Sequence, residues 1–333
     1  MKKIIPMMFC FDQNYVIPAA VAFYSLLENH QKTTGGGGVE FRLYIVHNDI
    51  STQDQEKLQD TIKPFSHFAT LEFIDGNKTF SEVWKKIKNK HHFSQEIFYK
   101  LIAPSLFPQY DKIIISDVDV VFLRSVVKEF EDFDVNQEYL IGGVVSNNPE
   151  SFSIPKKGYR SDYNQFDEYE LKGIQYGCDA AYLIINIKEW QKHSLEEKAL
   201  QCLQKNVGKL ILPEQNILGI VCYPYIKKIS MSYVVSNNAW DALGEDFSKL
   251  QPNIYSKEEI LEASKNPIQI HYSGGAKPWN TPSVPKSELW FEYLCKTLFL
   301  RDFLKKFEKT IINNYKKSSL THRLYNKIKA LLG

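Results

Sequence analysis

The sequence has few cysteines, and none of them has the spacing of a bridge or a metal site. Its 333 residues include five cysteines, an odd number, with no Cys-x-x-Cys pair. This pattern argues against a disulfide framework and a zinc site, and it favours a reducing compartment.

No run of 18 apolar residues occurs, so no membrane-spanning helix is predicted. The apolar run near the start is cut off by Asp12 without a small-residue cleavage site, which argues against a signal peptide. We therefore expect a cytoplasmic protein.

Two kinds of nucleotide-binding loop are also missing. The chain contains no Gly-x-Gly-x-x-Gly and no Walker-type loop, which argues against a dehydrogenase and an NTPase. Its aromatic residues are not interleaved with a basic groove, so no nucleic-acid partner is expected. Hydrophobic residues make up 44% of the chain and charged residues 24%, which is ordinary for a globular protein with a large core.

Strand and helix patterns alternate along the first part of the chain. Strands are expected over 4–11, 41–47 and 70–74, with helices over 18–29 and 52–62 between them. Strand, helix, strand at this spacing predicts right-handed crossovers and a parallel sheet.

The later part continues the α/β pattern less regularly. Strands are expected over 139–145, 176–187, 232–235 and 268–272, and helices over 95–106, 188–206 and 217–221. Residues 147–173 are polar without periodicity and are predicted to form either a functional loop or a disordered one. The fold class is therefore α/β, with a mostly parallel, Rossmann-like sheet flanked by helices.

The central stretch is a buried strand that ends in two aspartates. Residues 113–115 are three consecutive isoleucines, typical of a strand buried on both faces. Asp117 and Asp119 follow, and alternate residues of an extended chain point to the same side. Two carboxylates held together repel one another unless a cation neutralises them, and Mg²⁺ or Mn²⁺ prefers oxygen ligands. The alternative is a simple polar cap on the strand end.

Other polar residues are predicted at the same edge, because ligands of open α/β sheets lie outside the carboxyl ends of the strands. These are Asp12, Asn14, Tyr15, Asp179, His271, Gly274 and Lys277. A histidine could complete a two-carboxylate metal site, and a glycine turn followed by lysine suits a phosphate. Each also has a plain alternative: Tyr15 as a core aromatic, His271 as a structural histidine and Lys277 as a surface lysine.

The C-terminal segment is basic and amphipathic. Residues 301–333 hold nine Lys or Arg and two Asp or Glu, a net charge of +7, which leaves −5 for the rest. Such a helical tail suits an anionic membrane surface. The alternative is a helix packed on the body with solvated lysines. We expect one domain over 1–285 and a helical, basic tail over 286–333.

Five motifs occur in order along the chain: residues 11–15 (FDQNY), 116–119 (SDVD), 183–190 (LIINIKEW), 213–218 (PEQNIL) and 271–279 (HYSGGAKPW). Together they resemble family 8 glycosyltransferases, above all the bacterial enzymes that add hexoses to lipopolysaccharide or lipooligosaccharide. The resemblance implies a GT-A fold, a UDP-hexose donor, Mn²⁺ (or Mg²⁺) and retention of anomeric configuration. It also implies a saccharide acceptor. The basic tail predicts a peripheral place on the inner face of the cytoplasmic membrane and would suit a lipid-linked acceptor.

The resemblance assigns roles to the matching residues. The metal ligands would be Asp117, Asp119 and His271. The nucleotide, diphosphate and donor-sugar contacts would be Cys10, Phe11, Asp12, Asn14, Tyr15, Lys100, Val118, Ala180, Gly274 and Lys277. The catalytic residues, lining the donor sugar, would be Asp179, Glu214 and Gln215.

Three residues depart from the family pattern, and all three face the sugar subsite. Asp179 replaces the usual asparagine, Glu214 the usual aspartate, and Lys100 an arginine whose planar fork lysine does not reproduce. They leave the choice of hexose open, glucose or galactose. Because Gln215 is a neutral amide and a poor nucleophile, front-face attack by the acceptor hydroxyl is favoured.

Two other functions stay open. A catalytically silent sugar-nucleotide binding protein would fit the departures at the sugar subsite. A nucleotidyltransferase would need a triphosphate-binding loop, which the sequence lacks. Residues 147–173 and 236–246 are the segments expected to face the acceptor.

Overall fold

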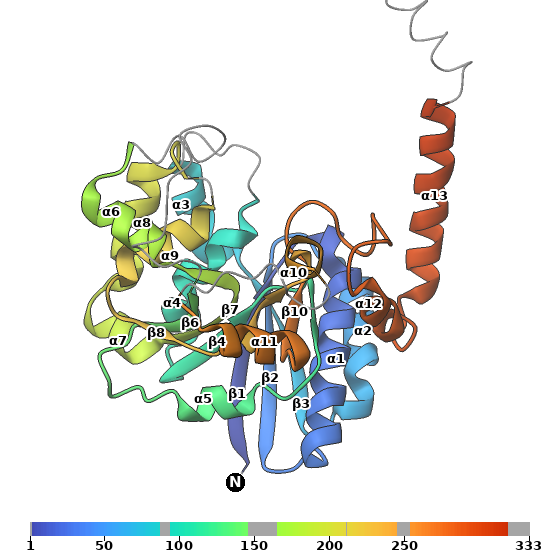
Figure 1. The fold of residues 1–333 in the computed structure, drawn as a ribbon, viewed down its shortest axis with the longest axis horizontal. Coiled ribbons are helices and arrows are strands. Elements are labelled where there is room, and N and C mark those ends of the chain that lie inside the picture. Colours follow the sequence, from blue (N-terminus) through green and yellow to red (C-terminus); the bar gives the residue numbers. More distant parts are fainter. Residues whose placement is uncertain (1, 87–93, 146–164, 211, 245–253, 319–333) are drawn as a thin grey trace, which may run out of the picture.

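The protein, a computed structural model, is an α/β structure built around two sheets (Figure 1). The structure describes residues 2–86, 94–145, 165–210, 212–244 and 254–318. The larger sheet has seven strands in the order β3-β2-β1-β4-β7-β6-β8. Its strands are β1 (Lys3–Cys10), β2 (Val39–His47), β3 (Ala69–Asp75), β4 (Lys112–Ser116), β6 (Ile141–Val145), β7 (Cys178–Asn186) and β8 (Ile226–Lys228).

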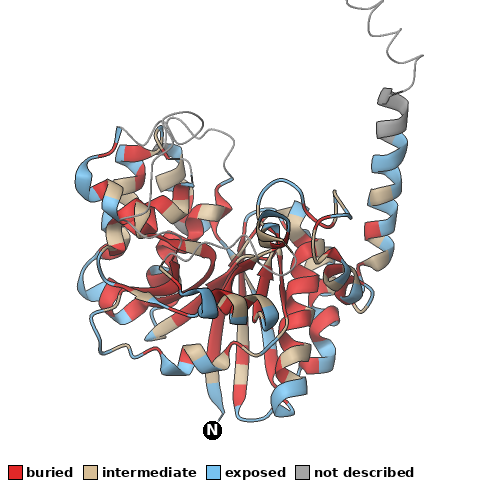
Figure 2. Cartoon of the chain, viewed as in Figure 1, coloured by how far each residue is buried: buried red, intermediate tan, exposed pale blue. Residues whose placement is uncertain are grey.

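The parallel first half of this sheet is confirmed. β1 pairs in parallel with both β2 and β4, and β2 pairs in parallel with β3. The crossovers are the helices α1 (Val16–Thr34) and α2 (Thr52–Ile62). Ile113, Ile114 and Ile115 of β4 have no exposed surface, as their β-branched run predicts. Figure 2 shows the buried residues concentrated on the strands and on the inner face of α1.

Strand β7 is reversed relative to its neighbours. It pairs antiparallel with β4 and with β6, while β6 pairs in parallel with β8. A reversed strand begins where the parallel strands end. Asp179, the second residue of β7, therefore lies at the same edge as the carboxyl end of β4, where the Asp117 N–H donates to Ala181 O over 3.1 Å.

A second, three-stranded sheet continues from that edge. It consists of β5 (Val120–Phe122), β10 (Gln269–His271) and β9 (Val235–Ser236). β10 lies antiparallel to β5, with His271 opposite Val120. This register brings the end of β10 beside Asp119, although the two residues are far apart in the sequence.

Several helices and one strand differ from the sequence predictions. The expected helix 188–206 is two helices, α7 (Ile187–Lys192) and α8 (Leu195–Asn206), separated at Ser194, whose φ is +50°. Residues 95–106 form the 3₁₀-helix η3 (Glu96–Ile102) and the short α4 (Ala103–Leu106). Of the expected strand 232–235, the first two residues belong to the 3₁₀-helix η5 (Met231–Tyr233), and Val235 begins the strand β9.

The predicted loop 147–173 ends in a helix. α6 (Glu168–Gln175) begins at Asp167, whose side chain accepts from the Glu170 N–H while Glu170 accepts from the Asp167 N–H. This reciprocal capping box terminates the loop. Residues 146–164 lie outside the described part of the chain.

The remaining helices flank the sheets and the C-terminal side. They are α3 (Asn77–Lys86), α5 (Val127–Asp132), α9 (Pro213–Cys222), α10 (Asn238–Leu243), α11 (Lys257–Lys265), α12 (Ser287–Leu294) and α13 (Leu300–Ser318); one further 3₁₀ turn is η1 (Gln13–Tyr15) and another η2 (Lys63–Phe65). None of the helices within the described ranges is both long and apolar enough to cross a membrane.

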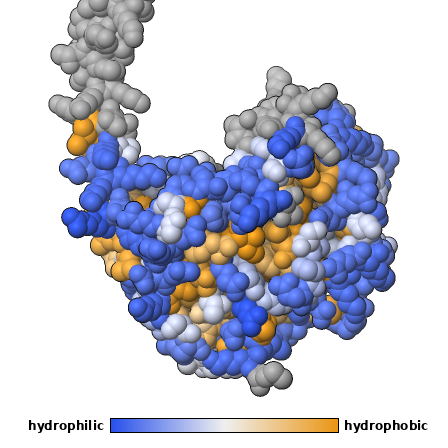
Figure 3. Space-filling view, turned by 180° about the vertical axis from the view of Figure 1, so that it is seen from behind, coloured by the Kyte–Doolittle hydropathy of each residue, from blue (hydrophilic) through white to orange (hydrophobic). Residues whose placement is uncertain are grey.

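Helix α13 is attached at its first turns and then projects from the body (Figure 1). Phe303 is buried, and its ring lies 5.6 Å from that of Trp290 on α12. Leu304, Ile311 and Ile312 are exposed, and apolar side chains are visible on this helix in Figure 3. Residues 319–333, the last part of the predicted tail, fall outside the described residues.

Candidate active site

Three potential metal ligands meet at the edge between the two sheets. Asp117 follows β4, Asp119 precedes β5, and His271 ends β10. One ligand atom from each lies within 4.8 Å of the others. The Tyr272 N–H donates to Asp119 O over 2.9 Å and ties β10 to the aspartate loop. The structure thus brings together the three residues expected to bind a metal.

The imidazole of His271 lies between two carboxylates, those of Asp119 and Asp179. His271 Nε2 lies 3.5 Å from Asp119 Oδ1, and His271 Nδ1 lies 3.8 Å from Asp179 Oδ2. Burial lowers the pKa of His271, but Asp119 and Asp179 outweigh it and raise that pKa to about 10. Burial likewise raises the pKa of Asp119, but His271 and Lys277 outweigh it and leave that pKa well below its ordinary value. The site therefore favours a bound positive charge.

The ligand atoms themselves fit a hard cation. Asp119 Oδ1 and His271 Nδ1 are buried and have no hydrogen-bond partner among the described residues. A buried polar atom without a partner carries a desolvation cost, which coordination to a cation removes. Two carboxylates and one imidazole form a donor set that suits Mn²⁺ and leaves positions for substrate oxygens.

Lys100 is a buried cation behind the aspartates. Only 2% of its surface is exposed, and its ammonium donates to Asp117 Oδ1 over 2.6 Å and to Ala180 O over 3.1 Å. Glu214 Oε1, on the first turn of α9, lies 3.7 Å from the same nitrogen. Burial lowers the pKa of Lys100, but Asp117 and Glu214 outweigh it and raise that pKa above its ordinary value. Burial raises the pKa of Glu214, and Lys100 offsets part of this effect.

A glycine turn and a second lysine lie on the other side of the aspartates. Lys277 is 8% exposed and donates hydrogen bonds to Asp119 Oδ2 and to Tyr272 O. Gly274 has a φ of +79°, a left-handed conformation that favours glycine. A Cβ atom built on Gly275 would meet no atom within 4 Å. This turn therefore has room for a ligand beside a fixed ammonium group.

A cleft of about 200 Å³ opens in front of Asp117 and Asp119. Its walls include six of the residues expected to contact the nucleotide or donor: Cys10, Phe11, Asp12, Tyr15, Lys100 and Val118. Burial raises the pKa of Tyr15 to about 12, with Asp119 contributing. The Tyr15 ring lies 5.9 Å from that of Trp279, edge to face, so its position is fixed.

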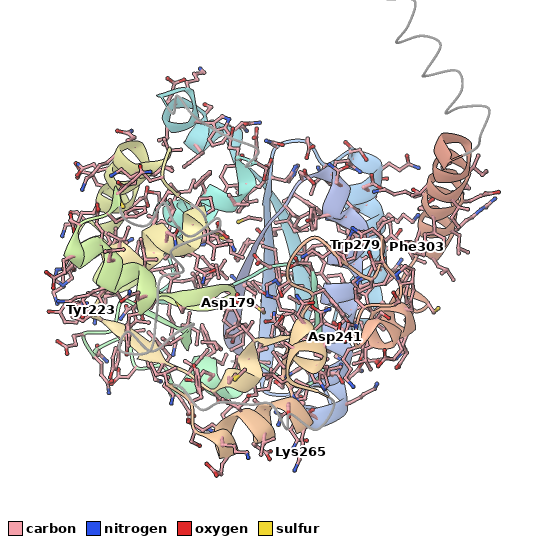
Figure 4. The ribbon with its side chains drawn as sticks, turned by 45° about the horizontal axis from the view of Figure 1, so that its top comes forward. Asp179, Tyr223, Asp241, Lys265, Trp279 and Phe303 are labelled. Atoms are coloured by element: carbon pink, nitrogen blue, oxygen red, sulfur yellow. The ribbon has the colours of Figure 1, made fainter. Side chains whose placement is uncertain are left out.

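Not every expected residue lines this cleft. Of the expected residues Asn14, Ala180, Asp179, Gln215, Gly274 and Lys277, none is among its walls. Asn14 instead hydrogen-bonds Asp12, with its backbone N–H 2.9 Å from Asp12 Oδ1. Gln215 follows Glu214 in the first turn of α9. Figure 4 shows Asp179 near the centre of the molecule.

Three cleft residues were not predicted from the sequence. Ser94, Glu96 and Ile97 lie at the start of η3 and line the same walls. Glu96 is 3% exposed, and burial raises its pKa. A glutamate in a polar stretch reads as solvated, so only the spacing of four residues to Lys100 could have drawn attention to it.

This arrangement matches a known family. A family model described as Glycosyl transferase family 8 matches residues 6–282. The chain belongs to this family. A family 8 glycosyltransferase with this sheet order and aspartate loop has the GT-A fold, so the expected fold class is confirmed.

Two similar curated proteins are bacterial. General stress protein A of Bacillus subtilis is 21% identical over 295 residues, covering 86% of this chain and 92% of that protein. A lipopolysaccharide 1,2-glucosyltransferase of Escherichia coli is 23% identical over 320 residues, covering 95% of this chain and 84% of that protein.

Two solved structures share the fold. The apo structure of the bifunctional glycosyltransferase WbbM has a TM-score of 0.72 at 21% identity; the match covers 92% of this family 8 chain and 52% of that one. The galactosyltransferase LgtC, solved with donor and acceptor sugar analogues, has a TM-score of 0.64 at 17% identity, covering 88% of this chain and 96% of that one.

Proposed function

We propose that this family 8 member is a retaining hexosyltransferase. It moves glucose or galactose from a UDP-sugar to a saccharide acceptor of the cell envelope, such as lipopolysaccharide, with Mn²⁺ or Mg²⁺ bound. The observation that carries the proposal is the meeting of Asp117, Asp119 and His271 within 4.8 Å beside the cleft. The name of the Escherichia coli relative supports a lipopolysaccharide acceptor.

Different residues of the chain bind different parts of the donor. A divalent cation, when bound, supplies positive charge that stabilises the UDP leaving group. Asp117, Asp119 and His271 hold that cation. Lys277 and the Gly274 turn bind the diphosphate, since an ammonium group and open backbone both suit phosphate oxygens.

The uridine end lies against the first strand. Asp12, Asn14 and Tyr15 bind the base and ribose, and the Tyr15 ring is already fixed by Trp279. The neighbouring contacts are Cys10, Phe11, Val118 and Ala180. A ring held in place loses little conformational freedom on binding, so it is a favourable stacking platform.

The sugar end is surrounded by charged groups. Glu214 Oε1 lies 3.7 Å from Lys100 Nζ, and Asp179 Oδ2 lies 3.8 Å from His271 Nδ1. Both carboxylates stabilise positive charge on the sugar ring as its bond to the leaving group breaks. Gln215 positions the sugar by hydrogen bonding, and the acceptor hydroxyl attacks from the front face. The ammonium group of Lys100 forms ion pairs with both Asp117 and Glu214 and so fixes the positions of the two carboxylates.

We propose that the chain has one catalytic domain, residues 1–285, followed by a basic C-terminal segment, residues 286–333, whose first helix, α12, packs into the core through Trp290 and Leu294. We propose that the basic residues and exposed apolar side chains of α13 place the enzyme on the anionic inner face of the cytoplasmic membrane. A peripheral position there would bring the active site to a lipid-linked acceptor.

The decisive experiment measures UDP release from a panel of UDP-sugars, with Mn²⁺ and with a chelator. We expect metal-dependent release from a single UDP-hexose, slow without acceptor. UDP binding without release from any donor would instead support a catalytically silent sugar-nucleotide binding protein, and metal-independent release would contradict the assigned metal site.

A further inference from the structure

A second cavity lies at the end of the sheet opposite the donor cleft. Its volume is about 550 Å³. It is bounded by the segment that precedes β6, the end of α7, the first turn of α8 and the segment that precedes β8. The hydrogen bonds Asn186 N–H to Leu140 O (3.0 Å) and Leu140 N–H to Tyr225 O (2.9 Å) define this end of the sheet. Tyr223 and Asp179 accordingly lie well apart in Figure 4.

Three tyrosines line this cavity. They are Tyr169 of α6 and, after α9, Tyr223 and Tyr225. Tyr169 is 54% exposed and Tyr225 42% exposed, which is high for aromatic side chains. The Tyr169 hydroxyl donates to Tyr223 O over 2.8 Å, and the two rings lie 5.8 Å apart. Tyr176 holds Tyr223 from another side, also at 5.8 Å. Tyr169 and Tyr223 are therefore held against one another, and Tyr169 and Tyr225 are exposed.

The polar part of the cavity has balanced charge. Glu189 is 7% exposed, and its carboxylate accepts from Lys192 over 3.0 Å and faces His193 Nε2 at 3.2 Å. Lys198 and Glu138 add one charge of each sign to the lining. Neither an anion nor a cation is favoured by such a lining.

These properties select a class of ligand. The volume lies within the range of small-molecule sites, about 300 to 1,000 Å³. Fixed tyrosine rings offer rigid contact area with a polar tip, at low entropic cost. A pyranose ring presents C–H groups on its face and hydroxyl groups on its edge, so it matches aromatic platforms combined with mixed donors and acceptors.

The cavity is mechanically linked to the donor site through α9. Glu214 lies at the start of this helix and Tyr223 just after its end, about 14 Å apart along the axis. α9 packs closely on α6, since a Cβ atom on Gly219 would come within 2.5 Å of Gly173 O. Helix α6, which carries Tyr169, thus packs on α9, which begins at the donor-site carboxylate Glu214 and ends next to Tyr223.

We propose that this tyrosine-lined cavity is a second saccharide site, which binds a sugar unit of the acceptor glycan remote from the point of transfer. The inference rests on the proposed function, because it takes a saccharide as the acceptor. A second contact with the same glycan converts part of its binding into an intramolecular event and raises its affinity.

The test compares the wild-type protein with a double variant, Tyr169→Ala with Tyr225→Ala. The probe is an array of bacterial core oligosaccharides, each printed in full length and as its terminal disaccharide. We expect the double variant to bind the full-length glycan about tenfold more weakly, with the disaccharide and UDP bound as before. The ring-preserving pair Tyr169→Phe with Tyr225→Phe should retain most of the affinity, and Leu298→Ala, an exposed apolar residue elsewhere, should retain all of it.

Equal glycan binding by the wild type and the alanine double variant would overturn the proposal. So would a wild-type protein that binds UDP but none of the glycans. Failure of the wild type to bind UDP as well would contradict the proposed function, and the inference with it. Unfolding midpoints of all variants, measured alongside, separate a lost site from a lost fold.

Discussion

The ammonium of Lys100 lies 2.6 Å from a carboxylate oxygen of Asp117, and almost none of this lysine is exposed to solvent. A lysine buried to this degree is rare unless it is paired. Its partners Asp117 and Glu214 would otherwise be two like charges at the base of the cleft. The pair therefore links the stability of the fold to the geometry of the donor site.

Removing this buried cation should be costly. We expect Lys100→Met to lower the free energy of unfolding by about 3 kcal/mol, because it leaves buried carboxylates without a counterion. Urea denaturation at pH 7 without added metal measures the effect. The control is Lys85→Met, which removes an exposed ion pair with Glu82 and should change stability by less than about 0.5 kcal/mol. An equal loss of unfolding free energy in the two variants would contradict the role of Lys100 as a buried counterion.

Divalent cations should stabilise the folded protein through the aspartate loop. With Mn²⁺ at about 100 times its dissociation constant, stabilisation of about 2.7 kcal/mol is expected for the wild type. Asp119→Asn and His271→Ala should each abolish the metal-dependent part, measured by thermal unfolding with and without chelator. Asp60→Asn, on the exposed face of α2, is the matched control and should respond like the wild type. An undiminished metal response in both site variants would exclude this metal site.

The carboxylates near the sugar should matter for turnover more than for binding. We expect Glu214→Gln to lower kcat by about 100-fold at saturating donor, with KM for the UDP-sugar within about threefold, because it removes charge needed as the sugar bond breaks. Asp179→Asn should act in the same direction. If both variants left kcat untouched, stabilisation of the sugar by these charges would be wrong.

The projecting part of α13 should direct the enzyme to membranes. A chain ending at Phe307 keeps the buried Phe303 and its stacked partner but loses most of the basic tail. We expect it to bind vesicles rich in anionic lipid at least tenfold more weakly, and to lose more activity on vesicle-bound acceptor than on a soluble analogue. Neutral vesicles are the control. An equal loss on both acceptors would argue for a helix with a purely structural role.

Acid should destabilise the start of α6. Burial raises the pKa of Glu170, but hydrogen bonds from Lys205 (2.6 Å) and Asn206 (3.1 Å) outweigh it and leave the pKa below its ordinary value of 4.5. The folded state thus holds the ionised form more strongly than the unfolded state. Its contribution is present above pH 4.5 and is lost as the pH falls through the folded pKa.

The measurement for Glu170 compares the wild type with Glu170→Gln. The difference in unfolding free energy should be largest near pH 6 to 7 and should narrow below pH 4.5. A difference that stays constant across this range would mean that the carboxylate charge contributes nothing.

The sequence predicted the first half of the sheet well because its strands are continuous apolar runs with clear crossovers. It also predicted that Asp117 and Asp119 would meet His271, although the register of β10 against β5 supplied the contact. The capping-box pattern of Asp167 and Glu170 is present in the sequence, but it lies in a polar stretch without periodicity, so helix α6 was not predicted. Burial of Glu96, and the ion pairs of Lys100, depend on long-range packing that no local pattern encodes.

The late position of β10 in the chain has a consequence for biosynthesis. During synthesis, domains fold from the N-terminus as the chain lengthens. A nascent chain that stops before residue 271 has the strands of the large sheet but neither His271 nor Lys277. Such a chain has only two of the three metal ligands. The complete site therefore forms only after the chain has been made and folded as far as Lys277, so a fragment released earlier would lack a metal ligand and the lysine beside it.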